Sequence, residues 1–433
     1  MPSSPGIAKT AAVQLFAGVQ WLVFMFANIV VIPLSVGGAY HLDAGQLAGA
    51  MSRSFVITGL ACLVQVFLGH RLPLMEGQSG MWWGVILNLA ATGTESGLSL
   101  QDVGGSIAVG MVLGGLAVVL CGLLGIHRVL NRLFTPVVMA VLLFLLASQL
   151  IDIFFHGMVG LEERTSIQPG VALLSIALVI GVSALTIGAP GILSNFAILI
   201  GLAVGWVVYV VCFGPSHGGA APQWGQMVEL YAWGHPVWHT GIVVACVVTA
   251  LINSTNTVAT LRAAEPLFGC RVDDRQFRRS FVVTGAFTAL SGPLALVPYA
   301  PYTSSIGFLR TTRLLDRGPF ILGAILFLLI GSIPPATGFF STLPVSVGDA
   351  VLFVAYLQLF GSALQNLEGL SFNYRTLFRL AGPTLLGLAI QATPASAFTS
   401  LPGMIQAIAS NGMLVGILAA VVLEALVPWH RFE

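Results

Sequence analysis

Charged residues are scarce in this sequence. Only 8% of its 433 residues are charged and 57% are hydrophobic, whereas a soluble globular domain carries about 25% charged residues. So few charges cannot cover a surface that faces water, which excludes a soluble globular protein. The composition suits a chain whose surface mostly faces lipid. A net charge of +1 creates no basic field, so we expect no nucleic-acid partner.

The signatures of metal sites and soluble enzymes are also missing. The five cysteines match no metal-binding spacing, and four of them lie in apolar runs, which predicts small buried apolar side chains and no metal. The sequence contains no Gly-x-x-x-x-Gly-Lys loop, Gly-x-Ser-x-Gly elbow or His-Glu-x-x-His pair. We therefore predict that the protein is not an enzyme and uses no cofactor.

Long apolar runs dominate what is present. About 20 apolar residues cross the hydrocarbon core of a bilayer. Twelve runs approach that length and two more, 73–91 and 299–312, are short and interrupted by Gly, Ser and Pro. The twelve lie near 11–36, 51–69, 104–126, 134–154, 171–188, 192–213, 240–261, 280–298, 319–335, 343–363, 380–392 and 411–428. The sequence predicts an all-α polytopic membrane protein.

The basic residues test this count. If both short runs are included and the N-terminus is cytoplasmic, 15 of the 17 basic residues lie inside, and only Arg53 and Arg164 lie outside. Omitting one short run would invert every later segment and remove the bias. The positive-inside rule therefore predicts fourteen transmembrane segments with both termini cytoplasmic. The membrane we expect to hold them is the cell (inner) membrane.

The two short segments occupy matching positions, third in the first seven segments and third in the second seven. Because seven is odd, the second half is inverted relative to the first, which predicts two inverted seven-segment repeats. Broken, small-residue segments at matching places in inverted repeats indicate a substrate site near the middle of the membrane. The alternative is that their Gly and Ser residues only allow close helix packing.

Polar residues within the spans are the candidate site residues. The eighth span contains five in a row at 253–257, including Asn253, Asn256 and Thr257, and such a run is costly unless it faces a cavity or a helix break. Gln20 and Asn28 share one face of the first span. They would contact a polar ligand or, alternatively, form an ordinary hydrogen bond between helices.

The short segments contribute a second group of candidates. Ser304 and Ser305 follow two prolines and could begin a half-helix whose N–H groups face a ligand. In the third segment, Ser79 and Gly80 would allow close backbone approach. Trp82 offers a stacking surface, although interfacial anchoring or packing explains a tryptophan equally well.

Acidic residues are few within the predicted spans. Glu76 and Glu424 lie near segment ends, and Asp349 begins the twelfth span. Of these three we take Asp349 as the candidate for ion coupling, because an intramembrane acid is a functional hypothesis by default.

Together these motifs resemble the nucleobase–ascorbate transporter family, in particular the bacterial uracil/xanthine permeases and, within them, a purine permease branch. The resemblance covers essentially the whole chain. Gln20-Trp21 stands where the family has Gln-His, and LPLMEGQSG at 72–80 resembles its entry to the third segment. SSIGFLRTTR at 304–313 resembles the family signature Gln/Glu-Asn-x-Gly-x-x-x-x-Thr-Arg, with Gly307, Thr312 and Arg313 retained.

The departures concern the titratable groups of the family's site. Where the family has Glu-x-x-Gly-Asp in the eighth span, this chain has Asn253, Asn256 and Thr257. Ser304 and Ser305 replace its Gln or Glu and its Asn. Family members are commonly proton or sodium symporters, and Asn and Ser cannot take up a proton near neutral pH. Amides can still hydrogen-bond a neutral planar ligand.

The resemblance also implies an elevator mechanism. A core domain would comprise 11–133 (spans 1–4) and 240–342 (spans 8–11), and a gate domain 134–239 (spans 5–7) and 343–433 (spans 12–14). The core would carry the substrate past the gate, through which the protein would form a homodimer in the lipid bilayer.

The sequence thus predicts a secondary transporter for a nucleobase, with purine slightly favoured over uracil. Asn253, Gly80 and Ser304 would bond the edge of the base, Asn28, Tyr302 and Trp82 would contact its faces, and Gln20 would order the site. The alternatives are an inorganic-anion transporter of related fold and a non-transporting nucleobase sensor.

Overall fold

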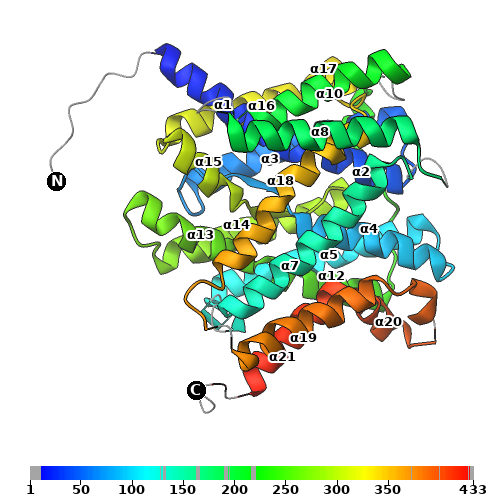
Figure 1. Ribbon diagram of the computed structural model, residues 1–433, viewed down its shortest axis with the longest axis vertical. Helices are drawn as coiled ribbons and strands as arrows, with labels where there is room; N and C mark the ends of the chain where they lie inside the picture. The colour runs from blue at the N-terminus through cyan, green and yellow to red at the C-terminus, as the bar shows by residue number, and fades with distance from the viewer. Residues whose placement is uncertain are drawn as a thin grey trace.

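The structure is a computed structural model, and it describes residues 11–126, 128–129, 133–161, 166–189, 194, 196–215, 221–371, 373–398, 400–427 and 429. Most of these residues are helical, and two three-residue strands pair inside the bundle. The helices lie roughly side by side, and the first and last of them, α1 and α21, have their terminal ends at the same end of the bundle (Figure 1).

The elements follow one another as fourteen segments. The first seven are α1 (Ala11–Ile29) with α2 (Val31–Ala39), α3 (Ala44–Phe67), β1 (Glu76–Gln78) with α4 (Gly80–Glu95), α5 (Leu100–Leu124), α7 (Pro136–Met158), α8 (Pro169–Gly188) and α10 (Ala197–Phe213). After the short α11 (Trp224–Met227) come α12 (Thr240–Asn253) with α13 (Thr255–Phe268), α14 (Asp274–Leu294), β2 (Tyr299–Pro301) with α15 (Ser304–Thr312), α16 (Arg317–Gly331) with α17 (Pro334–Phe340), α18 (Val345–Gln365), α19 (Tyr374–Gln391), η1 (Ala395–Phe398), and α20 (Gly403–Ala409) with α21 (Gly412–Leu426).

The predicted fold class is confirmed. Among the described residues, seven helices are long and apolar enough to cross a membrane alone, or eight if α16 and α17, bent by 90°, form one span. Length undercounts the spans because several are broken or short, and these include the β1–α4 and β2–α15 segments that the sequence predicts.

Local signals set many helix boundaries. Asp43 and Asp273 each accept a hydrogen bond from the backbone N–H of Gln46 and Gln276, respectively, and these capping boxes begin α3 and α14. Pro136 occupies the first turn of α7, where its missing N–H leaves no helical bond unmade. Gly115 allows α5 to cross α14 closely, since a Cβ there would lie 2.3 Å from the Ala289 nitrogen.

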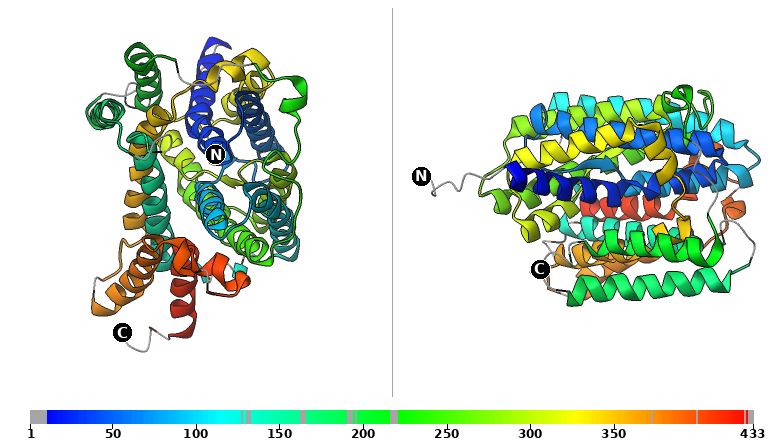
Figure 2. Two further views of the ribbon diagram at one scale, coloured as in Figure 1. Left: turned by 90° about the vertical axis from the view of Figure 1, so that its right-hand side faces the viewer. Right: turned by 90° about the horizontal axis from the view of Figure 1, so that it is seen from above.

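Helix packing falls into two groups. In one, α5 packs against α12 and α14, and α16 packs against α1 and α3. In the other, α7 packs against α18, α19 and α21, and α8 packs against α10 and α18. The left view of Figure 2 looks nearly along the helices and shows α8, α10, α19 and α21 at the side of the main bundle. The division into a core of 11–133 with 240–342 and a gate of 134–239 with 343–433 stays a prediction.

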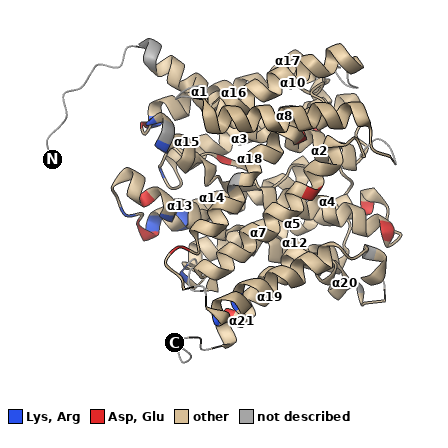
Figure 3. Ribbon diagram, in the orientation of Figure 1, with Lys and Arg blue, Asp and Glu red and all other residues tan. Residues whose placement is uncertain are grey.

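Charged side chains lie mainly at helix ends, and many basic residues gather at the end of the bundle that carries the chain termini (Figure 3). Arg53 is an exception, buried in α3 with its Nε donating to the Leu294 carbonyl at 3.0 Å. Arg164, the other basic residue predicted outside, lies beyond the described residues.

Glu424 has a structural partner. Arg379 of α19 donates to both of its carboxylate oxygens, from Nε at 2.6 Å and Nη2 at 2.8 Å. Thr135, before α7, donates to the same carboxylate at 3.1 Å. Glu424 therefore ties α21 to α19 and α7 at one end of the second group of helices.

We expect Glu424→Ala to lower the stability of the protein by about 2 kcal/mol. Removing one partner of a buried ion pair costs roughly 3–5 kcal/mol, and the side chains of Arg379 and Glu424 remain 16% and 8% exposed, which reduces that cost. Tm in detergent should fall clearly. Asp274→Ala is the control, because it removes the exposed Arg128–Asp274 pair and should cost under about 1 kcal/mol. Equal Tm values for the two variants would contradict this role for Glu424.

Candidate substrate site at the paired strands

Two short strands form the centre of the candidate site. β1 and β2 pair antiparallel, with Glu76 opposite Pro301, Gly77 opposite Ala300 and Gln78 opposite Tyr299. The pairing continues at both ends, where Ser79 N donates to Pro298 O at 2.7 Å and Tyr302 N donates to Met75 O at 2.8 Å. Because the strands are antiparallel and each leads into a half-helix, α4 and α15 begin at opposite ends of this pair.

The polar run of the eighth span contacts both strands. Asn253 Oδ1 accepts hydrogen bonds from Ser79 Oγ at 2.6 Å and from Asn256 Nδ2 at 3.1 Å, and its Nδ2 donates to Tyr299 O at 3.0 Å. Asn253 is 2% exposed, so these bonds satisfy most of the polar capacity of its amide. One side chain thus connects the break between α12 and α13 to the third and tenth segments.

Other members of the run stabilise the helix break itself. Ser254 Oγ donates to Leu251 O at 2.6 Å and Thr255 Oγ1 donates to Ile252 O at 2.7 Å. Both hydroxyls satisfy carbonyls of the preceding turn. Thr257 is buried, and its Oγ1 has no hydrogen-bond partner among the described residues.

The tenth segment contributes three predicted residues. The Tyr302 hydroxyl donates to the Gln78 carbonyl at the end of β1, and the buried Ser305 Oγ accepts from Met75 N at 3.1 Å. Both side chains therefore hold the strands together. Ser304, at the start of α15, is exposed.

Gly80 faces the second group of helices. A Cβ at this position would lie 3.1 Å from Leu150 Cδ1 of α7 and 3.4 Å from Tyr356 Cε1 of α18. Tyr356 packs edge-on against Phe154 at 5.4 Å between ring centroids. Sequence reasoning missed Tyr356, whose only local signal is a single hydroxyl in an apolar span.

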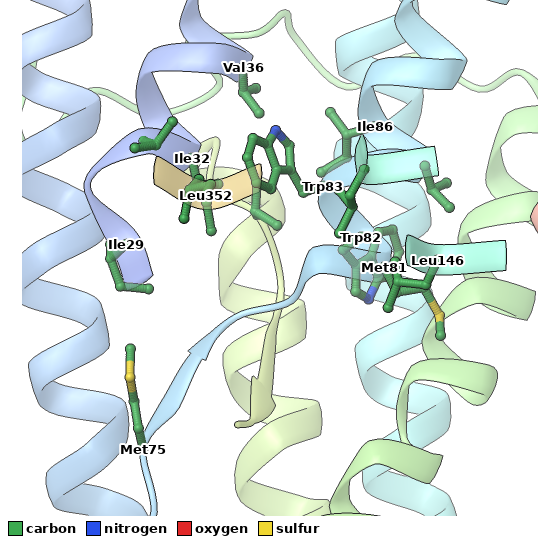
Figure 4. Packing of buried hydrophobic residues seen from close by; sticks show 14 of the residues in the cluster. Ile29, Ile32, Val36, Met75, Met81, Trp82, Trp83, Ile86, Leu146 and Leu352 are labelled. Atoms are coloured by element: carbon green, nitrogen blue, oxygen red, sulfur yellow. The ribbon is translucent and has the colours of Figure 1, made fainter. Parts of the chain in front are cut away.

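The predicted tryptophan packs away from the strands. Trp82 is fully buried and lies beside Met81 and Leu146, whereas Trp83 points toward Ile32 and Leu352 (Figure 4). Trp83 Nε1 donates to Ser35 Oγ at 3.2 Å, and Trp82 Nε1 has no partner among the described residues. Packing, the alternative that the sequence left open, describes the surroundings of both indoles.

The first-span residues lie on α1. Asn28 Nδ2 donates to Phe24 O of the same helix at 2.8 Å, and Gln20 is half-buried. The neighbouring Trp21 packs against Phe308 of α15, with ring centroids 4.6 Å apart.

Asp349 lies in the second group of helices. It is fully buried, and its Oδ2 would lie 1.7 Å from a Cβ placed on Gly157 of α7. The carboxyl is therefore set between α18 and α7, on helices different from those that carry β1, β2 and Asn253.

A cavity of about 600 Å³ lies where α4 ends, α12 begins and α20 passes. Its polar lining includes Thr92, Ser96, His239, Gln406 and Ser410. Ser79 and Asn253 are not among its lining residues. The polar groups at the strands are bonded to one another in this conformation and do not line that cavity.

This arrangement defines a class of protein. Two discontinuous segments at matching positions of two seven-segment halves, meeting inside an apolar bundle, are a feature of secondary membrane transporters. A family described as "Permease family" matches residues 12–396. The chain belongs to this permease family, that of the nucleobase–ascorbate transporters, and is a transporter rather than an enzyme.

The matching relatives are bacterial permeases. "Putative purine permease YwdJ" of Bacillus subtilis is 29% identical over 96% of this chain and 96% of its own length. "Uric acid permease PucK" of the same organism is 24% identical over 96% and 95%, respectively. "Xanthine permease", also from B. subtilis, is 23% identical over 97% and 94%.

Solved structures share the fold. The transmembrane domain of the cyanobacterial bicarbonate transporter BicA matches with a TM-score of 0.60 at 15% identity, covering 94% of this chain and 96% of that one. The murine anion transporter Slc26a9 in an inward-facing state matches with a TM-score of 0.62 at 11% identity, covering 99% and 70%. At these identities the likeness concerns the fold alone.

Proposed function

We propose that the protein is a secondary permease for a nucleobase, which binds between β1–α4 and β2–α15. The observation that carries this proposal is the position of Asn253, whose amide bonds the third and tenth segments at once. An amide donates and accepts, as the edge of a nucleobase does. A bound base would take over the hydrogen bonds that Ser79 and Asn256 now give to Asn253, and Ser304, Ser305, Thr257 and Gly80 lie on the segments that surround it.

The neutral character of these side chains supports a neutral ligand. Asn253 and Thr257 stand where the family has Glu and Asp, and Ser304 stands where it has Gln or Glu. An uncharged heterocycle therefore fits these side chains better than an ion does. The relatives named for uric acid and xanthine support a purine ahead of uracil. Asn28 and Gln20 lie on α1, which contacts β1, and Trp82 lies in the first turn of α4.

Contacts between the two groups of helices support alternating access. Along α4, Gln149 Nε2 donates to Gly84 O at 2.9 Å, Asn411 Nδ2 to Asn88 Oδ1 at 3.3 Å, and Gln406 Nε2 to Ser96 Oγ at 2.8 Å. These bonds join α4 to α7, α21 and α20. Ser304 and Gly307 of α15, and Thr303 just before it, are exposed.

We propose that a core of 11–133 and 240–342 moves as an elevator against a gate of 134–239 and 343–433, that the protein resides in the cell membrane with both termini cytoplasmic, and that the gate forms a homodimer.

Counterflow in proteoliposomes tests the function. Vesicles loaded with unlabelled xanthine, uric acid, hypoxanthine, guanine, adenine or uracil should take up the same labelled compound, with purines exchanging faster than uracil. Exchange of chloride or sulfate without exchange of any base would favour an anion transporter instead. Base binding without exchange would favour a sensor.

Asn253→Ala should weaken base binding by about 5- to 150-fold, because the loss of a buried polar contact costs roughly 1–3 kcal/mol. Binding is measured by isothermal calorimetry on the detergent-solubilised variant, with Tm confirming that it folds. Thr94→Ala is the control, since the Thr94 hydroxyl bonds only carbonyls of its own helix. Unchanged affinity in Asn253→Ala would remove Asn253 from the site.

A cross-link between α4 and α21 should stop transport if the core moves. In a cysteine-free background, Asn88→Cys with Asn411→Cys would be joined by a short thiol cross-linker, because their side chains are 3.3 Å apart. Arg128→Cys with Asp274→Cys is the matched control, since this pair, 3.1 Å apart, lies within the proposed core. Undiminished counterflow after complete cross-linking of the first pair would rule out movement between α4 and α21.

A further inference from the structure

One acidic group in the first group of helices has no part in the function proposed above. Glu76, in β1, is fully buried. Its Oε1 accepts a hydrogen bond from Thr284 Oγ1 of α14 at 2.6 Å, and its Oε2 accepts one from Gln65 Nε2 of α3 at 3.1 Å. The carboxyl therefore bridges two helices and the strand that leads to Ser79.

The groups that face Glu76 include no basic side chain among the described residues. From α3, Cys62 Sγ accepts a hydrogen bond from the backbone N of Glu76 at 3.3 Å and donates one to the backbone O of Glu76 at 3.4 Å. From β2, the Tyr299 hydroxyl is bonded to Thr58 at 3.3 Å. On α14 the nearest polar neighbours are Thr284 and Ser280, and α1 contains no charged residue within Ala11–Ile29.

Two further titratable groups, close to the N-terminal part of α14, form hydrogen bonds with backbone groups and not with Glu76. His70, in the connection from α3 to β1, accepts through Nδ1 from Leu72 N at 3.0 Å. Arg278 donates through Nε to Gly122 O at 3.2 Å. An ionised Glu76 would therefore be a buried charge without a compensating cation, which is costly, and a proton on the carboxyl removes that charge.

The surroundings have the hydrogen-bonding capacity that a protonated carboxyl needs. Gln65 Oε1 and Ser280 Oγ are both buried and have no partner among the described residues. If the Gln65 amide turns over, its Oε1 takes the position 3.1 Å from Glu76 Oε2 and can accept a hydrogen bond from the protonated carboxyl. The two orientations of such an amide differ little in shape.

We propose that Glu76 is the proton-binding residue that couples substrate movement to a proton gradient. The proton would come from water on one side of the membrane, reside on a Glu76 carboxyl oxygen while the core moves, and leave to water on the other side. The proposal rests on the proposed transport function. It places the coupling ion on β1, three residues before Ser79.

The same strand connects the two sites. Glu76 pairs with Pro301, the Gln78 carbonyl accepts from the Tyr302 hydroxyl, and Ser79 bonds Asn253. A change in the bonds of Glu76 to α3 and α14 would shift β1 and, through this chain of contacts, the groups that surround the substrate.

The test separates exchange from gradient-driven accumulation in proteoliposomes that contain the full chain. A gradient of one pH unit, acid outside, should drive about tenfold accumulation of xanthine by the wild type if one proton moves with each substrate. Glu76→Gln should retain counterflow but accumulate nothing above equilibrium, and its uptake should not vary with pH. Glu95→Gln is the matched control, because Glu95 is exposed at the end of α4 and should accumulate xanthine as the wild type does.

Thr284→Val provides a second variant that keeps the carboxyl. It removes a donor to the charged form of Glu76, so the pH midpoint of transport should move toward higher pH. This shift keeps the proposal testable even if Glu76→Gln does not fold.

The other outcomes contradict the proposal in distinct ways. Accumulation by Glu76→Gln at the wild-type level would remove Glu76 from coupling, and loss of accumulation in Asp349→Asn alone would assign coupling to Asp349. Accumulation driven by a sodium gradient and not by pH would show that the coupling ion is not a proton. Absence of counterflow in the wild type would instead reject the transport function itself.

Discussion

The pairing of β1 with β2 is the contact on which the rest of the structure depends. Backbone N–H and C=O groups at membrane depth must be bonded within the protein, and the residues that interrupt the third and tenth segments leave such groups outside any helix. Six residues paired antiparallel satisfy them. The pairing also brings together segments more than 200 residues apart, so the two half-helices and the break in the eighth span meet at one place.

The sequence predicted the spans and their breaks because both are local properties. Hydrophobic length and the bias of basic residues set the count of fourteen. Gly77, Pro298 and Pro301 lie in the breaks, where glycine and proline disfavour a helix locally. The partners of side chains across the bundle are not local. No pattern within 72–80 predicts that Glu76 meets Gln65 and Thr284, and a single tyrosine in an apolar span does not predict that Tyr356 faces Gly80. The polar run at 253–257 shows both cases. Its position in the eighth span was predictable from the sequence. Only the structure shows that Asn253 bonds the strands, whereas Ser254 and Thr255 stabilise the helix break.

Charge placement gives a final physical argument about coupling. Glu76 and Asp349 are the acidic residues that are buried in the described part of the chain. Glu76 belongs to the helices proposed to move and Asp349 to those proposed to stay. In an elevator, only a group carried by the moving domain changes its access from one side of the membrane to the other together with the substrate. The neutral residues at Asn253, Asn256 and Ser304 also let the substrate site pass α7 and α18 without carrying a charge of its own. Recognition by neutral amides and hydroxyls, and ion binding by a separate carboxyl on the same strand, is the division of roles that this arrangement of residues favours.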